Sequence, residues 1–176
     1  MVNEQEKTLD ALQIAIQMEI DGKEYYLKAG QDSTNEMGEK LFQSLAKAED
    51  THRQKFAEIY ESIRNDKSWP MIIFPPDSGK TLRTVFALAR KESADGIKLL
   101  DTELDAVQAA MGMENKTLDF YKGQEAKAGD ATEKGFYEAL AAEEREHYLI
   151  LLDYYEFLKN PAGWFVKSEH SSLDGG

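Results

Sequence analysis

The sequence predicts an all-α protein, a four-helix bundle in which a long crossover joins the second and third helices. Three observations support this fold. Apolar residues recur at three- and four-residue steps through four long segments. Short polar breaks divide the segments into two pairs, and a long interval separates the pairs. The two halves also match each other at a constant offset of 95 residues, as Glu19 and Glu114 illustrate, so the helix pairs form an internal two-fold repeat.

The four helices are expected at residues of about 8–29, 35–64, 102–128 and 131–159. Thr8 is a candidate cap for the first helix, which Gly30 is expected to end. Residues 32–34 offer a cap for the second helix, and Thr102 offers one for the third. Asn160 and the proline that follows it stop the fourth helix.

The crossover is expected over 65–101 and a C-terminal tail over 160–176, within a single domain of residues 1–176. Prolines interrupt helical structure early in the crossover, and a shorter helix is expected from Thr81 to about Glu92. The aromatic and apolar run from Trp69 to Pro76 is expected to cover the bundle or to form a dimer contact.

Composition excludes several classes of function. The chain of 176 residues is 41% hydrophobic and carries a net charge of −12, which disfavours nucleic acid and anionic membranes as partners and favours cations. It has no cysteine, which excludes disulfides and cysteine-ligated iron from these residues. No basic and apolar leader and no membrane-spanning run is present, so a soluble cytoplasmic protein is expected.

A glutamate and histidine pattern carries the strongest chemical signal. It occurs twice at the same spacing, as Glu19…Glu49-x-x-His52 and Glu114…Glu144-x-x-His147. Residues three apart on a helix lie on one face, so Glu49 and His52 can ligate adjacent metal ions. The short turn between the first two helices brings Glu19 back to the level of Glu49. Two-fold symmetry then assembles four carboxylates and two imidazoles, a set that suits iron or manganese.

This ligand set, its order and the crossover resemble the ferritin-like di-iron carboxylate proteins, and among them the rubrerythrin-like branch. The segments Met18-Glu19 with Tyr25-Tyr26, and Met113-Glu114 with Phe120-Tyr121, share in the resemblance. It implies that Glu49 and Glu144 bridge two iron ions. It further implies that Glu19 and His52 are terminal ligands of one iron, and Glu114 and His147 of the other. Tyr26 and Tyr121 lie two turns after the lone glutamates, so either a hydrogen bond to a ligating carboxylate or ordinary core packing is expected of them.

The resemblance implies a non-haem di-iron oxidoreductase that reduces hydrogen peroxide or dioxygen and acts in oxidative stress. A ferroxidase or iron-handling protein and a non-enzymatic metal-binding bundle are the alternatives, and manganese or a mixed metal pair also suits the ligands. Thr117 stands where rubrerythrins proper have a further carboxylate. Because cysteine is absent, electrons are expected from a separate donor such as a rubredoxin-like protein. The family also implies a homodimer.

Four further residues are assigned from their context. Glu143, next to Glu144, is expected to be a surface charge, and His170 in the tail to be structural or free. Gly22 and Gly112 are expected to permit close packing near the site.

Overall fold

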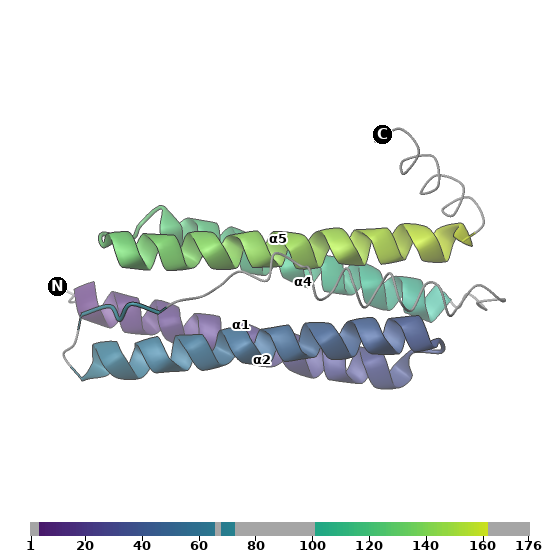
Figure 1. Cartoon of the computed structure of the whole chain (residues 1–176), viewed down its shortest axis with the longest axis horizontal. Coiled ribbons are helices and arrows are strands. Elements are labelled where there is room, and N and C mark those ends of the chain that lie inside the picture. The colour runs from purple at the N-terminus through teal and green to yellow at the C-terminus, as the bar shows by residue number, and fades with distance from the viewer. Residues whose placement is uncertain (1–3, 66–67, 73–100, 162–176) are drawn as a thin grey trace, which may run out of the picture.

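The computed structural model describes residues 4–65, 68–72 and 101–161. These residues form four long helices (Figure 1). Their bounds are Glu4–Asp32 for α1, Glu36–Arg64 for α2, Asp101–Glu125 for α4 and Ala131–Lys159 for α5. The predicted four-helix bundle is thereby confirmed. The expected helix from Thr81 to about Glu92, the segment 73–76 and His170 lie outside the described residues.

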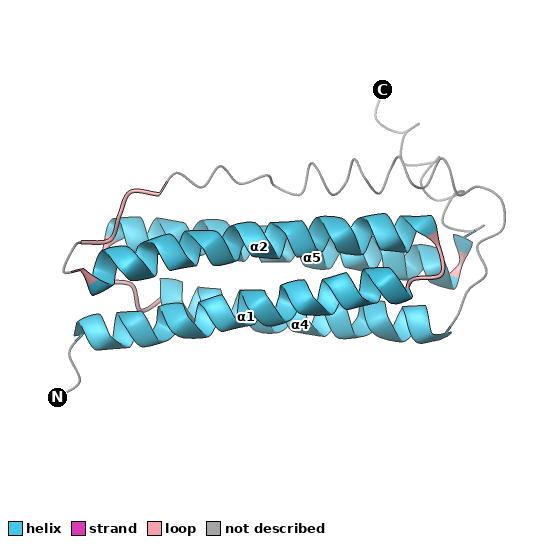
Figure 2. Ribbon diagram, turned by 90° about the horizontal axis from the view of Figure 1, so that it is seen from below, coloured by secondary structure: helices cyan, strands magenta, loops and turns pink. Residues whose placement is uncertain are grey.

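The bundle is built from two antiparallel helix pairs, α1 with α2 and α4 with α5 (Figure 1). The pairs meet so that α1 lies beside α4 and α2 beside α5 (Figure 2). The colours in Figure 1 show that α2 and α4 run in the same direction, which is the topology that a long crossover between them requires. Among the described helices, none combines the length and the apolar character that a bilayer crossing demands.

Several predicted helix ends are wrong. The helix α1 already begins at Glu4, and the Thr8 hydroxyl donates to the Glu4 carbonyl at 3.1 Å inside the helix, so Thr8 is no cap. Gly30 does not end α1. It is buried against α2, where a Cβ atom on it would lie 3.4 Å from Phe42 Cβ, so this glycine serves the close approach of two helices.

The other helix ends follow side-chain capping. The cap of α2 is Asn35, not residues 32–34, and its side chain accepts a hydrogen bond from Gly38 N at 2.8 Å. Thr102 lies inside α4, which includes Asp101 and ends at Glu125, three residues earlier than predicted. The bounds of α5 match the prediction, and the Asp130 side chain caps its first turn.

Two apolar clusters fill the bundle on either side of a polar middle. Along α2, Met37 to Ala46 belong to the first cluster and Phe56 to Ile63 to the second. Along α5 the order is reversed, because that helix runs the opposite way. The intervals between the clusters hold the Glu-x-x-His segments, so the bundle core encloses them at mid-length.

The described part of the Trp69 to Pro76 run covers one end of the bundle, as one of the two expectations proposed. The Trp69 ring lies 5.9 Å from the Phe136 ring and 5.8 Å from the Tyr137 ring, and Ile72 packs on the same cluster. Met71 between them is 86% exposed.

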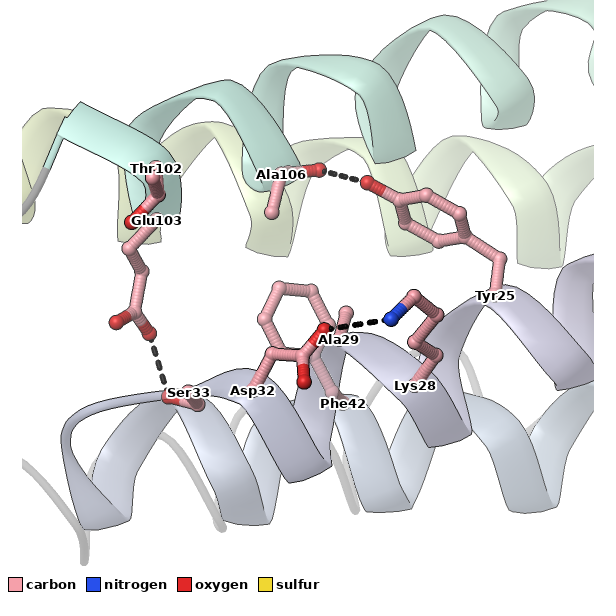
Figure 3. A pocket seen from close by; sticks show the side chains of 9 residues that line it. All are labelled: Tyr25, Lys28, Ala29, Asp32, Ser33, Phe42, Thr102, Glu103 and Ala106. Atoms are coloured by element: carbon pink, nitrogen blue, oxygen red, sulfur yellow. Dashed lines mark hydrogen bonds and ion pairs between the residues drawn. The ribbon is translucent and has the colours of Figure 1, made fainter.

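Glu103 of α4 ties the α1 to α2 turn to the other helix pair. Its buried carboxylate accepts hydrogen bonds from Ser33 Oγ at 2.6 Å, from the Thr34 hydroxyl at 3.0 Å and amide at 3.2 Å, and from Tyr154 OH at 2.7 Å. Figure 3 shows Glu103 reaching from α4 toward Ser33 beside a cavity of about 230 Å³, where Tyr25 OH donates to the Ala106 carbonyl at 2.7 Å. These contacts fix how the two pairs meet.

Candidate metal centre

All four helices contribute to one buried polar cluster at mid-length. The six side chains of the repeated pattern lie together there and are at most 4% exposed: Glu19, Glu49, His52, Glu114, Glu144 and His147. Their backbones are ordinary helix, so the three-residue spacing in α2 and α5 turns each glutamate and its histidine to the same inner face.

The first half of the cluster surrounds His52. Its Nδ1 atom lies 3.1 Å from Glu144 Oε1, 3.5 Å from Glu19 Oε2 and 3.8 Å from Glu49 Oε2. One donor atom from each of these four residues fits within a 4.8 Å span, which is the spacing of a single metal site.

The second half surrounds His147 in the same way. Its Nδ1 atom lies 3.2 Å from Glu49 Oε1, 3.4 Å from Glu144 Oε2 and 3.6 Å from Glu114 Oε2. These four residues also fit within a 4.8 Å span. The imidazoles of His52 and His147 lie nearly parallel, with ring centroids 5.6 Å apart. Glu49 and Glu144 belong to both halves, and each turns one oxygen toward each imidazole.

Two tyrosines each form a hydrogen bond from one half of the repeat to the other. Tyr26 OH of α1 donates a hydrogen bond to Glu114 Oε1 of α4, and Tyr121 OH of α4 donates to Glu19 Oε1 of α1. The expected hydrogen bond to a carboxylate of the pattern is therefore present. The acceptor belongs to the other half of the repeat, because helices α1 and α4 lie side by side.

Both phenols remain protonated donors. Burial raises the pKa of Tyr26, and the nearby carboxylate of Glu114 raises it further. Burial likewise raises the pKa of Tyr121, with Glu19 adding to the effect. Each hydroxyl therefore keeps the proton that it donates.

The acid and base groups of the cluster are strongly perturbed. Burial raises the pKa of Glu19 and of Glu114, and repulsion from Glu49 and Glu144, respectively, adds to it. Burial would also raise the pKa of Glu144, but the imidazoles of His147 and His52, whose Nδ1 atoms lie 3.4 and 3.1 Å from its oxygens, hold it below the ordinary value. Glu144 thus stays ionised more readily than Glu19 and Glu114.

The imidazoles are shifted in the direction that favours a positive charge. Burial alone would lower the pKa of His52 and His147, but the carboxylates of Glu19 and Glu114 raise it instead. Without a cation, protons on the imidazoles and on two carboxylates must balance the buried negative charge.

The residues fit two divalent cations. Within the described residues, the buried oxygens Glu19 Oε2, Glu49 Oε1 and both of Glu144, together with Nδ1 of His147, make no hydrogen bond. Such atoms are costly to bury unless something binds them. Two metal ions would engage these atoms and neutralise four carboxylates. Oxygen and imidazole donors of this kind suit iron or manganese.

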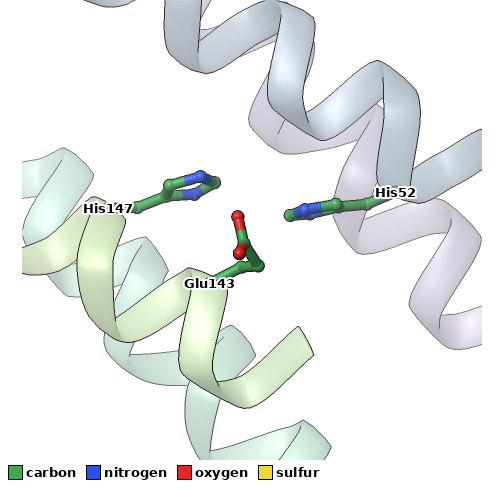
Figure 4. A group of neighbouring side chains, drawn as sticks. All are labelled: His52, Glu143 and His147. Atoms are coloured by element: carbon green, nitrogen blue, oxygen red, sulfur yellow. The ribbon is translucent and has the colours of Figure 1, made fainter. Parts of the chain in front are cut away.

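The prediction that Glu143 is a surface charge is wrong. The residue is 5% exposed. Figure 4 shows its carboxylate between the imidazoles of His52 and His147, and one donor atom from each of the three lies within a 4.8 Å span. Glu143 lies three residues after the buried Leu140 and four before His147 on α5, so helical spacing is the signal that would have placed it on the inner face.

The two glycines near the site differ. A Cβ atom on Gly22 would lie 3.4 Å from Glu49 Cγ, so this glycine does permit close packing at the cluster. The same prediction for Gly112 is wrong, because a Cβ atom there would meet nothing within 4 Å. Gly112 lies on the exposed side of α4.

Comparison with known proteins agrees with this geometry. The family model described as Rubrerythrin matches residues 10–155, a span that contains the whole buried cluster. No curated protein and no solved structure gives a significant match to the chain.

Proposed function

Because the chain belongs to the rubrerythrin family, we propose that it is a di-iron oxidoreductase that reduces hydrogen peroxide or dioxygen with electrons from an external donor. The observation that carries the proposal is the sharing of Glu49 and Glu144 between two sets of four ligand atoms. Shared carboxylates are what a pair of adjacent metal ions needs.

In this proposal Glu49 and Glu144 would help to hold both iron ions. Glu19 and His52 would hold one of them, and Glu114 and His147 the other. When bound, such a pair of iron ions would supply two-electron redox chemistry for peroxide or dioxygen reduction, with the electrons coming from the external donor. Manganese in one or both positions is the alternative that the same ligands allow.

The remaining residues act on ligand position and on water. Tyr26 and Tyr121 each hold one oxygen of a terminal glutamate, which leaves its other oxygen for a metal ion. The apolar clusters at either side exclude bulk water from the carboxylates. A low-dielectric enclosure of this kind strengthens the attraction between metal ions and their ligands.

The electron donor is proposed to be a separate protein. These 176 residues contain no cysteine and so hold no rubredoxin-type iron of their own. We propose a rubredoxin-like protein as the donor and a homodimer as the working form.

A stopped-flow experiment tests the reaction. Protein loaded anaerobically with ferrous iron is mixed with hydrogen peroxide in one series and with dioxygen in another, and iron oxidation is followed by absorbance. Faster oxidation by peroxide, with the iron retained and reducible again over repeated cycles, supports a peroxidase. Faster oxidation by dioxygen, followed by release of ferric iron from the site, contradicts it and supports an iron-handling ferroxidase.

A further inference from the structure

A small cavity opens onto the cluster from the seam between α1 and α4. Its volume is about 10 Å³, and its floor consists of Glu49, Glu114 and Tyr26. Its mouth is formed by half-buried side chains of the two helices and by one buried glycine: Met18, Met113, Thr117 and Gly22.

The residues at the mouth of the cavity come from equivalent positions in the two halves of the repeat, whereas the residues of its floor do not. Met18 and Met113 occupy equivalent positions of the two halves, and so do Gly22 and Thr117. On the floor, Glu49 and Glu114 are present but their equivalents, Glu144 and Glu19, are not. The cavity is therefore asymmetric, and both carboxylates of its floor belong to the metal position that contains Glu114 and His147.

We attribute this asymmetry of the cavity to Gly22, which has no side chain. A Cβ atom there would lie 3.4 Å from Glu49 Cγ and 3.6 Å from Glu49 Oε2. It would therefore occupy the space directly above that carboxylate. At the equivalent position of the other half, Thr117 has a branched side chain and lines the same cavity. The repeat thus has a glycine above Glu49 where its other half has a branched residue.

We propose that this seam is the entry port for the small oxidant, that Gly22 keeps it open, and that the oxidant arrives at the metal position held by Glu114 and His147. The inference rests on the proposed function and specifies its substrate class. The cavity is at the lower limit for holding one water molecule, so a port here is narrow and favours oxidants as small as dioxygen and hydrogen peroxide over organic hydroperoxides with bulky substituents. The two halves then differ in function although their ligands are equivalent.

The test measures the rate of azide association with the diferric protein, a binding readout that needs no turnover. Gly22→Ala adds one methyl group at the port, and the association rate constant is expected to fall by at least about tenfold. Thr117→Ala widens the mouth from α4, and the rate constant is expected to rise. The matched control is Gly112→Ala, a second glycine in a helix interior where the added methyl group meets nothing within 4 Å. Its rate constant is expected to equal that of the unmodified chain.

The possible outcomes distinguish a failure of the entry-port proposal from a failure of the proposed di-iron function. If the unmodified chain binds iron and azide, but Gly22→Ala and Thr117→Ala leave the rate unchanged, the port is wrong and the di-iron function stands. If Gly22→Ala loads less iron, the direction of the Thr117→Ala change decides the question. If the unmodified chain binds no iron, both proposals fail together.

Discussion

Tyr26 OH donates a hydrogen bond to Glu114, a residue 88 positions further along the chain and in the other helix pair. The equivalent bond from Tyr121 to Glu19 spans 102 positions. Each half of the repeat therefore holds the lone glutamate of the other half in place. A single helix pair would leave its glutamate without this donor, so the cluster is complete only when the two pairs dock.

Removing these hydroxyls tests their role at the site. Tyr26→Phe and Tyr121→Phe free one oxygen of the glutamate that each tyrosine holds, and metal affinity is expected to fall by about 10- to 100-fold, as for other groups that orient metal ligands. Isothermal titration with manganese or ferrous ions measures the change. Tyr60→Phe is the control, because that hydroxyl contacts only Gln13 among the interactions found for it, at the surface. Equal affinity for all four proteins would contradict the account.

The shared and terminal carboxylates predict different stoichiometries. Glu144→Gln removes a ligand from both positions, and the variant is expected to lose both metal ions. Glu19→Gln affects only the position with His52, and about one metal ion per chain is expected to remain. Elemental analysis after gel filtration measures the ratio. Glu58→Gln, on the exposed face of α2, is the control and should retain the full complement. If Glu19→Gln and Glu144→Gln lose the same amount of metal, Glu144 is not shared.

Metal uptake is expected to depend on pH. The pKa values of Glu19, Glu114, His52 and His147 are raised, so the metal-free cluster holds protons that a cation must displace. Because deprotonation favours the metal-bound form and these pKa values are raised, affinity should go on increasing with pH above the ordinary carboxylate range of about 4 to 5 and above the imidazole value of about 6.5. A pH indicator in weakly buffered solution measures the release of protons. Uptake without proton release would contradict the predicted charge balance.

Gly38 tests the contact between the helix pairs. A Cβ atom there would overlap oxygen atoms of Glu103, Ser33 and Tyr154, so Gly38→Ala is expected to lower the free energy of unfolding by about 1–3 kcal/mol. In contrast, Gly112→Ala adds a methyl group in open space and is expected to raise it by up to about 1 kcal/mol through helix propensity. Urea unfolding followed by circular dichroism measures both. A Gly38→Ala variant as stable as the unmodified chain would show that this junction tolerates rearrangement.

Local sequence patterns predicted the parts of the molecule that repeat. The constant offset between the halves identified the helix pairs and the six residues that the structure brings together, because helical spacing alone puts Glu49 beside His52. Glu143 was expected at the surface, although it lies three residues after Leu140 and four before His147, a spacing that places it on the buried face of α5. Features that depend on how the pairs meet were not predictable in this way. No sequence pattern indicated the role of Glu103, because the four groups that donate hydrogen bonds to its carboxylate lie in the distant α1 to α2 turn and in α5.

Helix ends show the same distinction. Thr8 and Gly30 have the residue types that cap and end helices, but Thr8 lies inside α1, where its hydroxyl donates to the Glu4 carbonyl, and a tertiary contact decides the role of Gly30. Gly30 packs against Phe42 and α1 continues past it to Asp32. Asn35, three residues before Gly38, provides the hydrogen bond that starts α2. Propensity therefore located the turn and did not identify the capping residue.

We propose above all that the six buried residues, which come from all four helices, hold two adjacent iron ions. A crystal structure of the iron-loaded protein, with anomalous diffraction recorded on both sides of the iron absorption edge, tests this claim most directly. The account predicts two iron peaks in each chain, one near His52 and one near His147, with the carboxylates of Glu49 and Glu144 between them. A single peak, or iron bound only at the acidic surface, would contradict it.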